Sequence, residues 1–230
     1  MKKKPELPHY SMSQAELVST ATTKQGYLRR DLDALKPYGV TPARLDALQA
    51  LTAAFVALPT ETEGVQATAT ATLAKEGART AALGTMQRIM GIVGLVHHDR
   101  TPQYKAFGTA GLNSASDGDL YLGLVRAVRV GRANLATYAP KGLTAAALSQ
   151  LEAENATLLA TVGNQYDTES GAAGATQQRL TAGNALYDEL VALCDAGKAA
   201  FVQTDVSKHQ DYVIYDAPAP AKAPAKPAVA

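Results

Sequence analysis

The sequence is short of aromatic residues and of cysteine. Its 230 residues include no Trp, 3 Phe and 1 Cys. A single thiol excludes an intramolecular disulfide framework and the usual cysteine-based zinc sites. With so few aromatic rings, Ala and Leu must fill most of the interior, and Ala is the strongest helix former. This composition favours closely packed helices.

A strong net charge and a long apolar run are also lacking. The formal net charge is +1, which argues against a chain-wide electrostatic role with nucleic acid but leaves a local patch open. No run of 18 apolar residues occurs, so no membrane span is expected. The segment 1–9 begins like the basic part of a signal peptide, but no apolar stretch follows. The simplest expectation is a soluble, cytoplasmic protein.

Capping residues and helical spacing of apolar side chains predict an all-α protein. Ser13 and Glu16 form a capping box, and Thr41-Pro42 supplies an N-cap followed by proline at the first helical position. Apolar residues then recur at near-helical intervals. Helices are predicted near 14–36, 42–57, 61–97, 117–138, 145–166 and 172–203.

The same order of caps and turns occurs twice. The pattern at 13–16 recurs at 116–119, and the Pro-x-Gly-[Val/Leu]-Thr turn at 37–41 recurs at 140–144, both at an offset of 103 residues. A four-residue insertion makes the offset 107 for the third helix of each half. The repeat predicts an antiparallel bundle of about six helices, built from two duplicated three-helix units that bury their apolar stripes together.

The remaining segments complete the predicted domain organisation. A linker rich in Gly, Thr, Ser, Asn and Pro indicates a loop. A short apolar run near the C-terminus has β propensity, and the Pro/Ala/Lys segment after it cannot bury a core. The predicted parts are a flexible basic N-terminus (1–12), a first three-helix unit (13–98), a connecting loop (99–115), a second unit (116–210), an extended strap (211–216) and a disordered tail (217–230).

A metal site is considered at His97, His98 and Asp99. Metal ligands on one helix need a spacing of three or four residues to share a face, whereas adjacent histidines point about 100° apart. A structural role at the helix C-terminus is therefore preferred, and a metal-binding helical protein stays an alternative. No Glu-x-x-His pair, nucleophile elbow or phosphate-binding loop is present, so no cofactor is expected.

Two further groups of residues are candidates for binding. One predicted helix carries arginine at every third position, at Arg126, Arg129 and Arg132. The pattern is typical of an ordinary solvated face, or it forms a site for anions, nucleic acid or an acidic partner. The apolar run near the C-terminus contains Tyr212 and Tyr215. This run is interpreted as a docking segment for a partner or, preferably, as a strap over the protein's own bundle.

Several segments resemble helical proteins common in Bacteroidota-type bacteria. They are GNALYDEL at 183–190, GKAAF at 197–201, KHQDYVIY at 208–215 and FGTAGL at 107–112. Those proteins have no established activity, so the resemblance implies an all-helical fold and a bacterial source and transfers no site residues.

The absence of a convergent polar constellation favours a non-enzymatic function. The leading hypothesis is a helical structural or protein-interaction protein that also self-associates. The alternative is a module that binds anions or nucleic acid through the arginine stripe, and metal binding is the second alternative.

Overall fold

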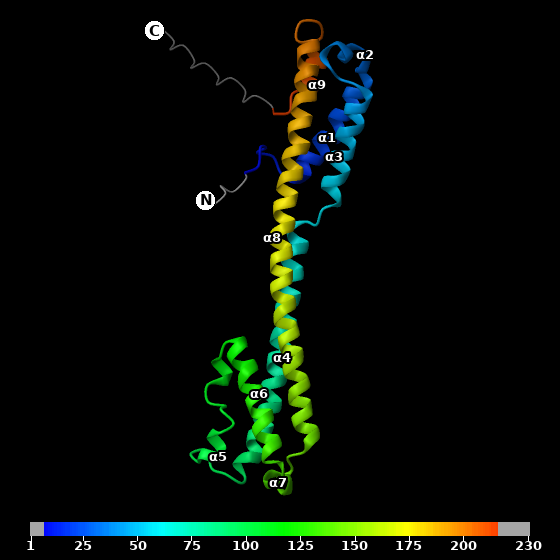
Figure 1. The fold of residues 1–230 in the computed structure, drawn as a ribbon. Helices are drawn as coiled ribbons and strands as arrows, with labels where there is room; N and C mark the ends of the chain where they lie inside the picture. The colour runs from blue at the N-terminus through cyan, green and yellow to red at the C-terminus, as the bar shows by residue number, and fades with distance from the viewer. Residues whose placement is uncertain (1–6, 216–230) are drawn as a thin grey trace, which may run out of the picture. The chain divides into compact units, whose positions relative to one another are not determined.

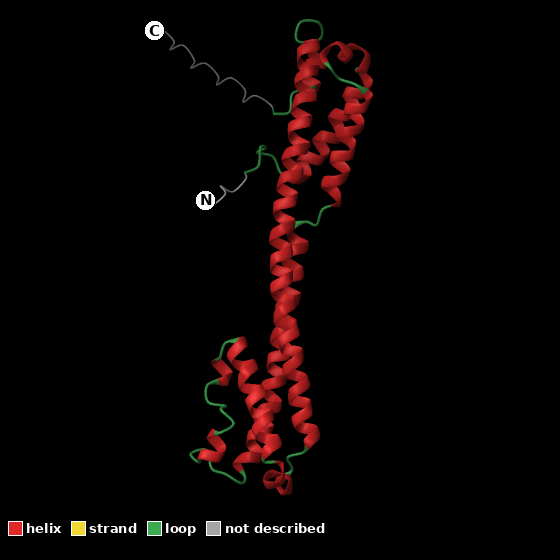
Figure 2. Ribbon diagram, viewed as in Figure 1, coloured by secondary structure: helices red, strands yellow, loops and turns green. Residues whose placement is uncertain are grey.

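The computed structural model describes residues 7–215, and every regular element within that range is helical (Figures 1 and 2). The all-α prediction is therefore confirmed. None of these helices is both long and apolar enough to cross a membrane. The predicted disordered tail, 217–230, lies outside the described residues. The α-helices are α1 (Gln14–Arg30), α2 (Leu32–Leu35), α3 (Pro42–Ala57), α4 (Glu61–Gly94), α5 (Pro102–Lys105), α6 (Asp117–Ala133), α7 (Leu135–Tyr138), α8 (Ala145–Phe201) and α9 (Val206–Asp211).

Helix α8 corrects the prediction of separate helices at 145–166 and 172–203, because it runs unbroken over 57 residues. The corresponding chain of the first half does break. Leu58 is extended, with ψ of 143°, because Pro59 disfavours the helical conformation in the residue before it. No proline stands within α8. Glycine costs only about 1 kcal/mol in a helix, so Gly171 and Gly174 do not end it.

The described residues divide into two compact units. Unit 1 comprises residues 7–60 and 175–215, and unit 2 comprises 61–174, so that α8 contributes to both. These units differ from the predicted ones, because α4 packs in unit 2 and the later part of α8 completes unit 1. The first ten residues of α4 include no buried side chain, so they offer no apolar stripe to cover α1 and α3.

Unit 1 closes over a leucine-rich core. Apolar positions of α1 and α3 face a stripe on α8, and an aromatic side chain from the C-terminal segment covers one end. The large side chains of this core are Leu17, Leu28, Leu35, Leu45, Leu48, Phe55, Leu186, Leu190, Leu193, Phe201 and Tyr212.

Unit 2 has a core with the same spacing. α1 and α6 are both 17 residues long and start 103 residues apart, and the buried positions of α3 and of the start of α8 also differ by 103. The third helices align at an offset of 104, and not at the predicted 107. Buried pairs at this offset are Ala82 with Leu186, Met86 with Leu190, Ile89 with Leu193 and Met90 with Cys194.

The terminal segments differ from their predicted conformations. The backbone amide of His9 donates to Asn184 Oδ1 (2.9 Å), and the His9 ring nitrogen Nδ1 lies 2.9 Å from an Asp188 carboxylate oxygen. Residues 7–12 therefore contact α8. The predicted extended strap is not a strand in its described part, because Asp211 ends α9 and residues 212–215 form a turn. The predicted loop 99–115 contains the short helix α5 and a 3-10 turn at Leu112–Ser114.

Candidate functional site: an arginine-lined hollow on unit 2

Helix α6 positions the three arginines of the candidate site. Its N-cap, Ser116, accepts a hydrogen bond from the backbone amide of Asp119 (3.1 Å). The helix then buries Leu120, Leu124 and Ala127 in the unit 2 core. Because residues three apart lie on neighbouring turns of one side, Arg126, Arg129 and Arg132 are left together on the exposed side.

The three arginines have different surroundings. Arg132 forms a two-pronged ion pair with Glu152 of α8, in which Nη1 donates to Oε1 (3.2 Å) and Nη2 to Oε2 (2.6 Å). Arg126 lies over Gly108, where an added Cβ would stand 2.7 Å from its Nη1. Within the described residues, no carboxylate forms an ion pair with Arg126 or Arg129. Two guanidinium groups of the stripe therefore form no ion pair within residues 7–215.

A hollow of about 260 Å³ lies between α6 and α8. Its walls come from Val125, Val128, Arg129, Arg132, Glu152 and Asn155. Asn155 is 4% exposed, and its Nδ2 donates to the carbonyl oxygen of Tyr121 (3.1 Å). Its Oδ1 accepts no hydrogen bond from the described part of the chain. A buried acceptor without a partner costs about 1–3 kcal/mol, so Asn155 lowers the stability of the wall of the hollow.

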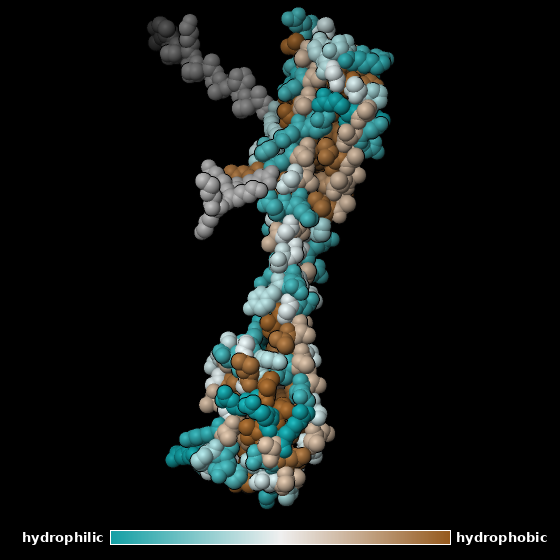
Figure 3. All heavy atoms as spheres, in the orientation of Figure 1, coloured by the Kyte–Doolittle hydropathy of each residue, from teal (hydrophilic) through white to brown (hydrophobic). Residues whose placement is uncertain are grey.

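Exposed apolar side chains surround the hollow. Leu122, Val125 and Leu159 are 64%, 41% and 50% exposed. In Figure 3, apolar and strongly polar residues lie side by side on the surface of this unit. We call this surface the arginine face and define it by Leu122, Val125, Arg126, Arg129, Arg132, Asn155 and Leu159. An apolar surface crossed by guanidinium groups is typical of protein-binding sites.

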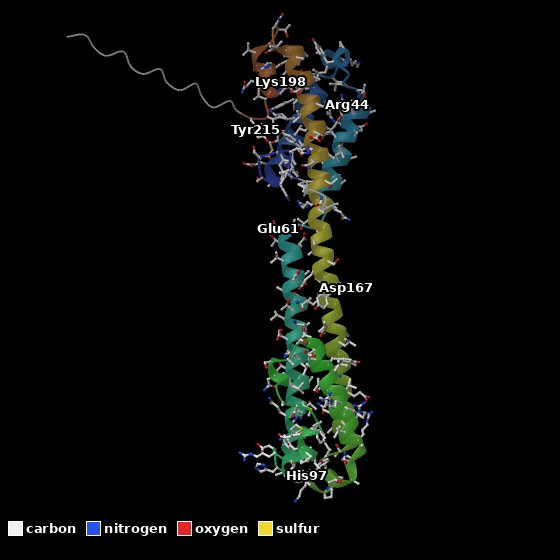
Figure 4. The ribbon with its side chains drawn as sticks, turned by 60° about the vertical axis from the view of Figure 1, so that its left-hand side comes forward. Arg44, Glu61, His97, Asp167, Lys198 and Tyr215 are labelled. Carbon is white, nitrogen blue, oxygen red and sulfur yellow. The ribbon has the colours of Figure 1, made fainter. Side chains whose placement is uncertain are left out.

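The predicted metal candidates do not converge. The His97 ring packs edge-on against Tyr138, with ring centroids 5.7 Å apart. The His98 ring bonds to the neighbouring Asp99 carboxylate, and Figure 4 shows His97 at one end of unit 2. Residues 7–215 contain no group of three His, Cys, Asp or Glu side chains that could hold a metal ion.

The two tyrosines proposed for docking are separated in the structure. Tyr212 is fully buried, and its ring stacks on Phe201 with centroids 6.0 Å apart. Tyr215 is 43% exposed, and its hydroxyl accepts from the backbone amide of Ser11 (3.1 Å). Tyr212 therefore belongs to the core of unit 1, which leaves only Tyr215 at the surface.

Sequence reasoning missed a buried charge network in unit 1. Asp31, 5% exposed, accepts from Arg30 (2.6 Å), Lys208 (2.7 Å) and the Tyr212 hydroxyl (2.8 Å). Burial alone would raise the pKa of Asp31, but these hydrogen bonds outweigh it and lower the pKa. Lys208 and Asp31 lie 177 positions apart in the sequence, so no local sequence pattern predicts their contact.

The lone thiol is unsuited to nucleophilic chemistry. Cys194 lies in the core of unit 1, and burial raises its pKa to about 12. The thiolate is the nucleophilic form, so this side chain stays protonated near neutral pH and serves as a small apolar residue.

No protein family, curated protein or solved structure matches the chain. The functional interpretation therefore rests on the geometry of its own side chains.

Proposed function

We propose that this chain is a non-enzymatic helical protein-interaction module and that the arginine face of unit 2 binds an acidic protein partner. One observation carries the proposal. The arginine face brings together exposed apolar side chains and two guanidinium groups that form no ion pair within the described residues. A partner that offers carboxylates and apolar side chains satisfies both.

The corresponding surface of unit 1 supports this proposal by contrast. At an offset of 103, Leu122 and Val125 correspond to Ser19 and Thr22, and Arg129 corresponds to Gly26. Arg29, which corresponds to Arg132, donates to Asp46 Oδ1 (3.1 Å) and to Gln49 Oε1 (3.0 Å). Unit 1 is thus polar and internally paired where unit 2 is apolar and charged.

We also propose that the two units descend from a duplicated segment. Equal helix lengths, matched Ser caps and matched left-handed glycines at Gly39 and Gly142 support it. A duplicated scaffold conserves core positions for packing, while its exposed positions are free to diverge. The arginine face would then be the divergent surface on which function resides.

A labelled peptide provides the test. The probe is a designed helix of alternating Leu and Glu turns, followed by fluorescence anisotropy at low salt. We expect a dissociation constant of about 10–100 µM, as for small transient interfaces. Replacing Arg126 and Arg129 by Ala should weaken binding about tenfold or more, because the glutamate carboxylates of the peptide then lose their guanidinium partners.

The matched control removes the same charge from unit 1, through Arg29→Ala with Lys36→Ala, and should leave peptide affinity unchanged. Raising the salt to about 0.3 M should weaken the wild-type complex, because exposed ion pairs are screened. Equal affinity in the wild type and in the Arg126→Ala, Arg129→Ala variant would overturn the proposal. Tighter binding to an oligothymidylate than to the peptide would instead favour the nucleic-acid alternative.

A further inference from the structure

A stretch of unit 2 consists of two helices with almost no core. Residues 61–76 of α4 pair with residues 163–174 of α8. An added Cβ on Gly64 would stand 3.5 Å from the Ala172 Cβ, and Gln165 Nε2 donates to Thr72 Oγ1 (3.4 Å). Ala71 is the only buried residue within these two ranges. We call this stretch the acidic pair, and Figure 4 shows Glu61 and Asp167 on its two helices.

The acidic pair exposes large apolar side chains. Val65, Leu73 and Tyr166 are 64%, 74% and 68% exposed. Helices in a bundle bury such side chains against neighbouring helices, whereas the described residues leave most of the surface of these three side chains exposed. A further helical surface that packed here would bury them.

The negative charge of the acidic pair indicates which surface could cover it. The acidic pair carries one ammonium group, Lys75, which lies 3.7 Å from Glu76 and 3.4 Å from Asp117. Its five carboxylates belong to Glu61, Glu63, Glu76, Asp167 and Glu169. A surface with this excess of negative charge repels its own kind and attracts guanidinium groups. The arginine face supplies them, together with three exposed apolar side chains.

We propose that the acidic pair of one copy docks on the arginine face of a second copy. This inference rests on the proposed function and names the partner as the chain itself. The Tyr166 ring cannot reach the hollow of its own copy, because eleven residues of the continuous helix α8, about 16 Å at 1.5 Å per residue, separate Asn155 from Tyr166. The two surfaces differ from each other, so one such contact leaves one surface of each kind free. These surfaces either pair with each other in a two-fold dimer or add further copies head-to-tail.

Tyr166 fits the hollow chemically. A phenol ring is apolar on its faces and carries one O–H donor at its tip. Val125 and Val128 supply apolar walls. The docked phenol ring packs on these valines with its hydroxyl toward the polar rim, while carboxylates beside Tyr166, such as that of Asp167, pair with Arg126 and Arg129.

Light scattering coupled to gel filtration tests the contact on the full chain. At low salt, the wild type should exceed the monomer mass of 24.0 kDa as concentration rises, and high salt should return it to the monomer. Two charge-neutralised variants should each give a monomer. Arg126→Ala with Arg129→Ala disables the arginine face, and Asp167→Asn with Glu169→Gln disables the acidic pair.

The most specific test is the mass of a mixture of the two neutralised variants. Each retains one intact surface of opposite kind, so a head-to-tail contact should give a 1:1 dimer that does not grow further. Two monomers after mixing would overturn the inference. Larger assemblies from the mixture would also overturn it, since no third copy can be added through the proposed surfaces.

Tyrosine variants test the hollow. Tyr166→Ala should weaken self-association about tenfold or more, as removal of a central aromatic anchor does, and Tyr166→Phe should weaken it less. The control is Tyr38→Ala in unit 1, a tyrosine that is 47% exposed. An equal effect of Tyr38→Ala and Tyr166→Ala would contradict the assignment.

The Leu/Glu peptide separates the two proposals. Each tyrosine or acidic-pair variant retains an intact arginine face and should still bind the peptide with wild-type affinity. A wild type that binds the peptide but stays monomeric at high concentration would overturn only the self-docking inference. A wild type that neither binds the peptide nor self-associates would overturn both the proposed function and the self-docking inference.

Discussion

The two units have similar cores, but different segments of the chain cover them. In unit 1, segments from both ends of the chain pack on α8, and Tyr212 reaches the buried carboxylate of Asp31. In unit 2, the corresponding position is Asn134, which is exposed, and Phe107 from the connecting loop packs on Tyr138. Shared buried positions therefore define the helical scaffold. The differing positions decide how each unit is closed and which surface it offers.

The difference extends to the arginines. Unit 1 pairs Arg29 with Asp46 and Arg30 with Asp31 and Asp211, so its charges stabilise its own fold. Unit 2 leaves Arg126 and Arg129 beside exposed apolar side chains. The comparison indicates that unit 1 uses its polar residues mainly for stability and that unit 2 keeps some for binding.

The largest expected effect comes from removing the aromatic closure of unit 1. Tyr212→Ala deletes a fully buried ring and its hydroxyl contacts, so we expect a loss of about 3–5 kcal/mol in the free energy of unfolding. Urea denaturation measures the loss, and hydrogen exchange should locate it in unit 1. Tyr215→Ala is the control and should cost less than about 1 kcal/mol. Equal exchange changes in both units would contradict independent closure.

A smaller effect is expected from neutralising the buried carboxylate. Asp31→Asn should cost about 1–3 kcal/mol at neutral pH, because Arg30 and Lys208 lose a charged acceptor but are themselves partly exposed. The carboxyl has a lower pKa in the folded state than its unfolded value of about 3.9. Its stabilisation is therefore present above about pH 4 and declines as the pH falls further.

The pH dependence checks the assignment of this network. Wild-type stability should fall more steeply than that of Asp31→Asn as the pH is lowered below about 4, so the two curves converge. Asn134→Ala in unit 2 is the matched control and should keep the wild-type pH dependence. Parallel curves for the wild type and Asp31→Asn would show that other carboxyls account for the acid sensitivity.

Much of the helical framework could be predicted from the sequence because its causes are local. Ser13, Thr41 and Pro42 mark helix starts by their own chemistry, and each stands at the predicted cap. The continuity of α8 was not predictable, because Gly171 and Gly174 resemble a turn but cost too little to break a helix. The assignment of α4 to unit 2 depends on tertiary packing, which helical periodicity does not encode.

The candidate site was predictable only in part. The spacing of Arg126, Arg129 and Arg132 identifies one side of a helix. The ion-pair partner of Arg132, Glu152, and the buried amide of Asn155 come from α8, at least 20 residues away. For Tyr212 the sequence favours a strap over a docking residue. Its full burial was not predictable, because it depends on Phe201 and Asp31, which no spacing connects to it.

The smallest expected difference concerns the two matched helix caps. Ser13→Ala and Ser116→Ala each remove a side-chain acceptor for the third backbone amide of the helix, which should cost about 1 kcal/mol. In unit 1, Glu16 Oε2 still accepts from the residue 13 backbone amide (2.7 Å), so half of the capping box survives. In unit 2, the one hydrogen bond of the Asp119 carboxylate to a described residue is with the Ser116 hydroxyl (2.7 Å), so Ser116→Ala removes this bond together with the bond from the Asp119 amide.

We therefore expect Ser116→Ala to destabilise the protein slightly more than Ser13→Ala, by a few tenths of a kcal/mol. Each substitution should accelerate hydrogen exchange at the start of its own helix, α1 or α6, and leave the other helix unchanged. Adding Glu16→Gln to Ser13→Ala should remove the charged half of the box and bring the unit 1 cost close to that of unit 2. A larger loss from Ser13→Ala alone would mean that the capping hydroxyl contributes more in unit 1 than the surviving Glu16 contact can offset.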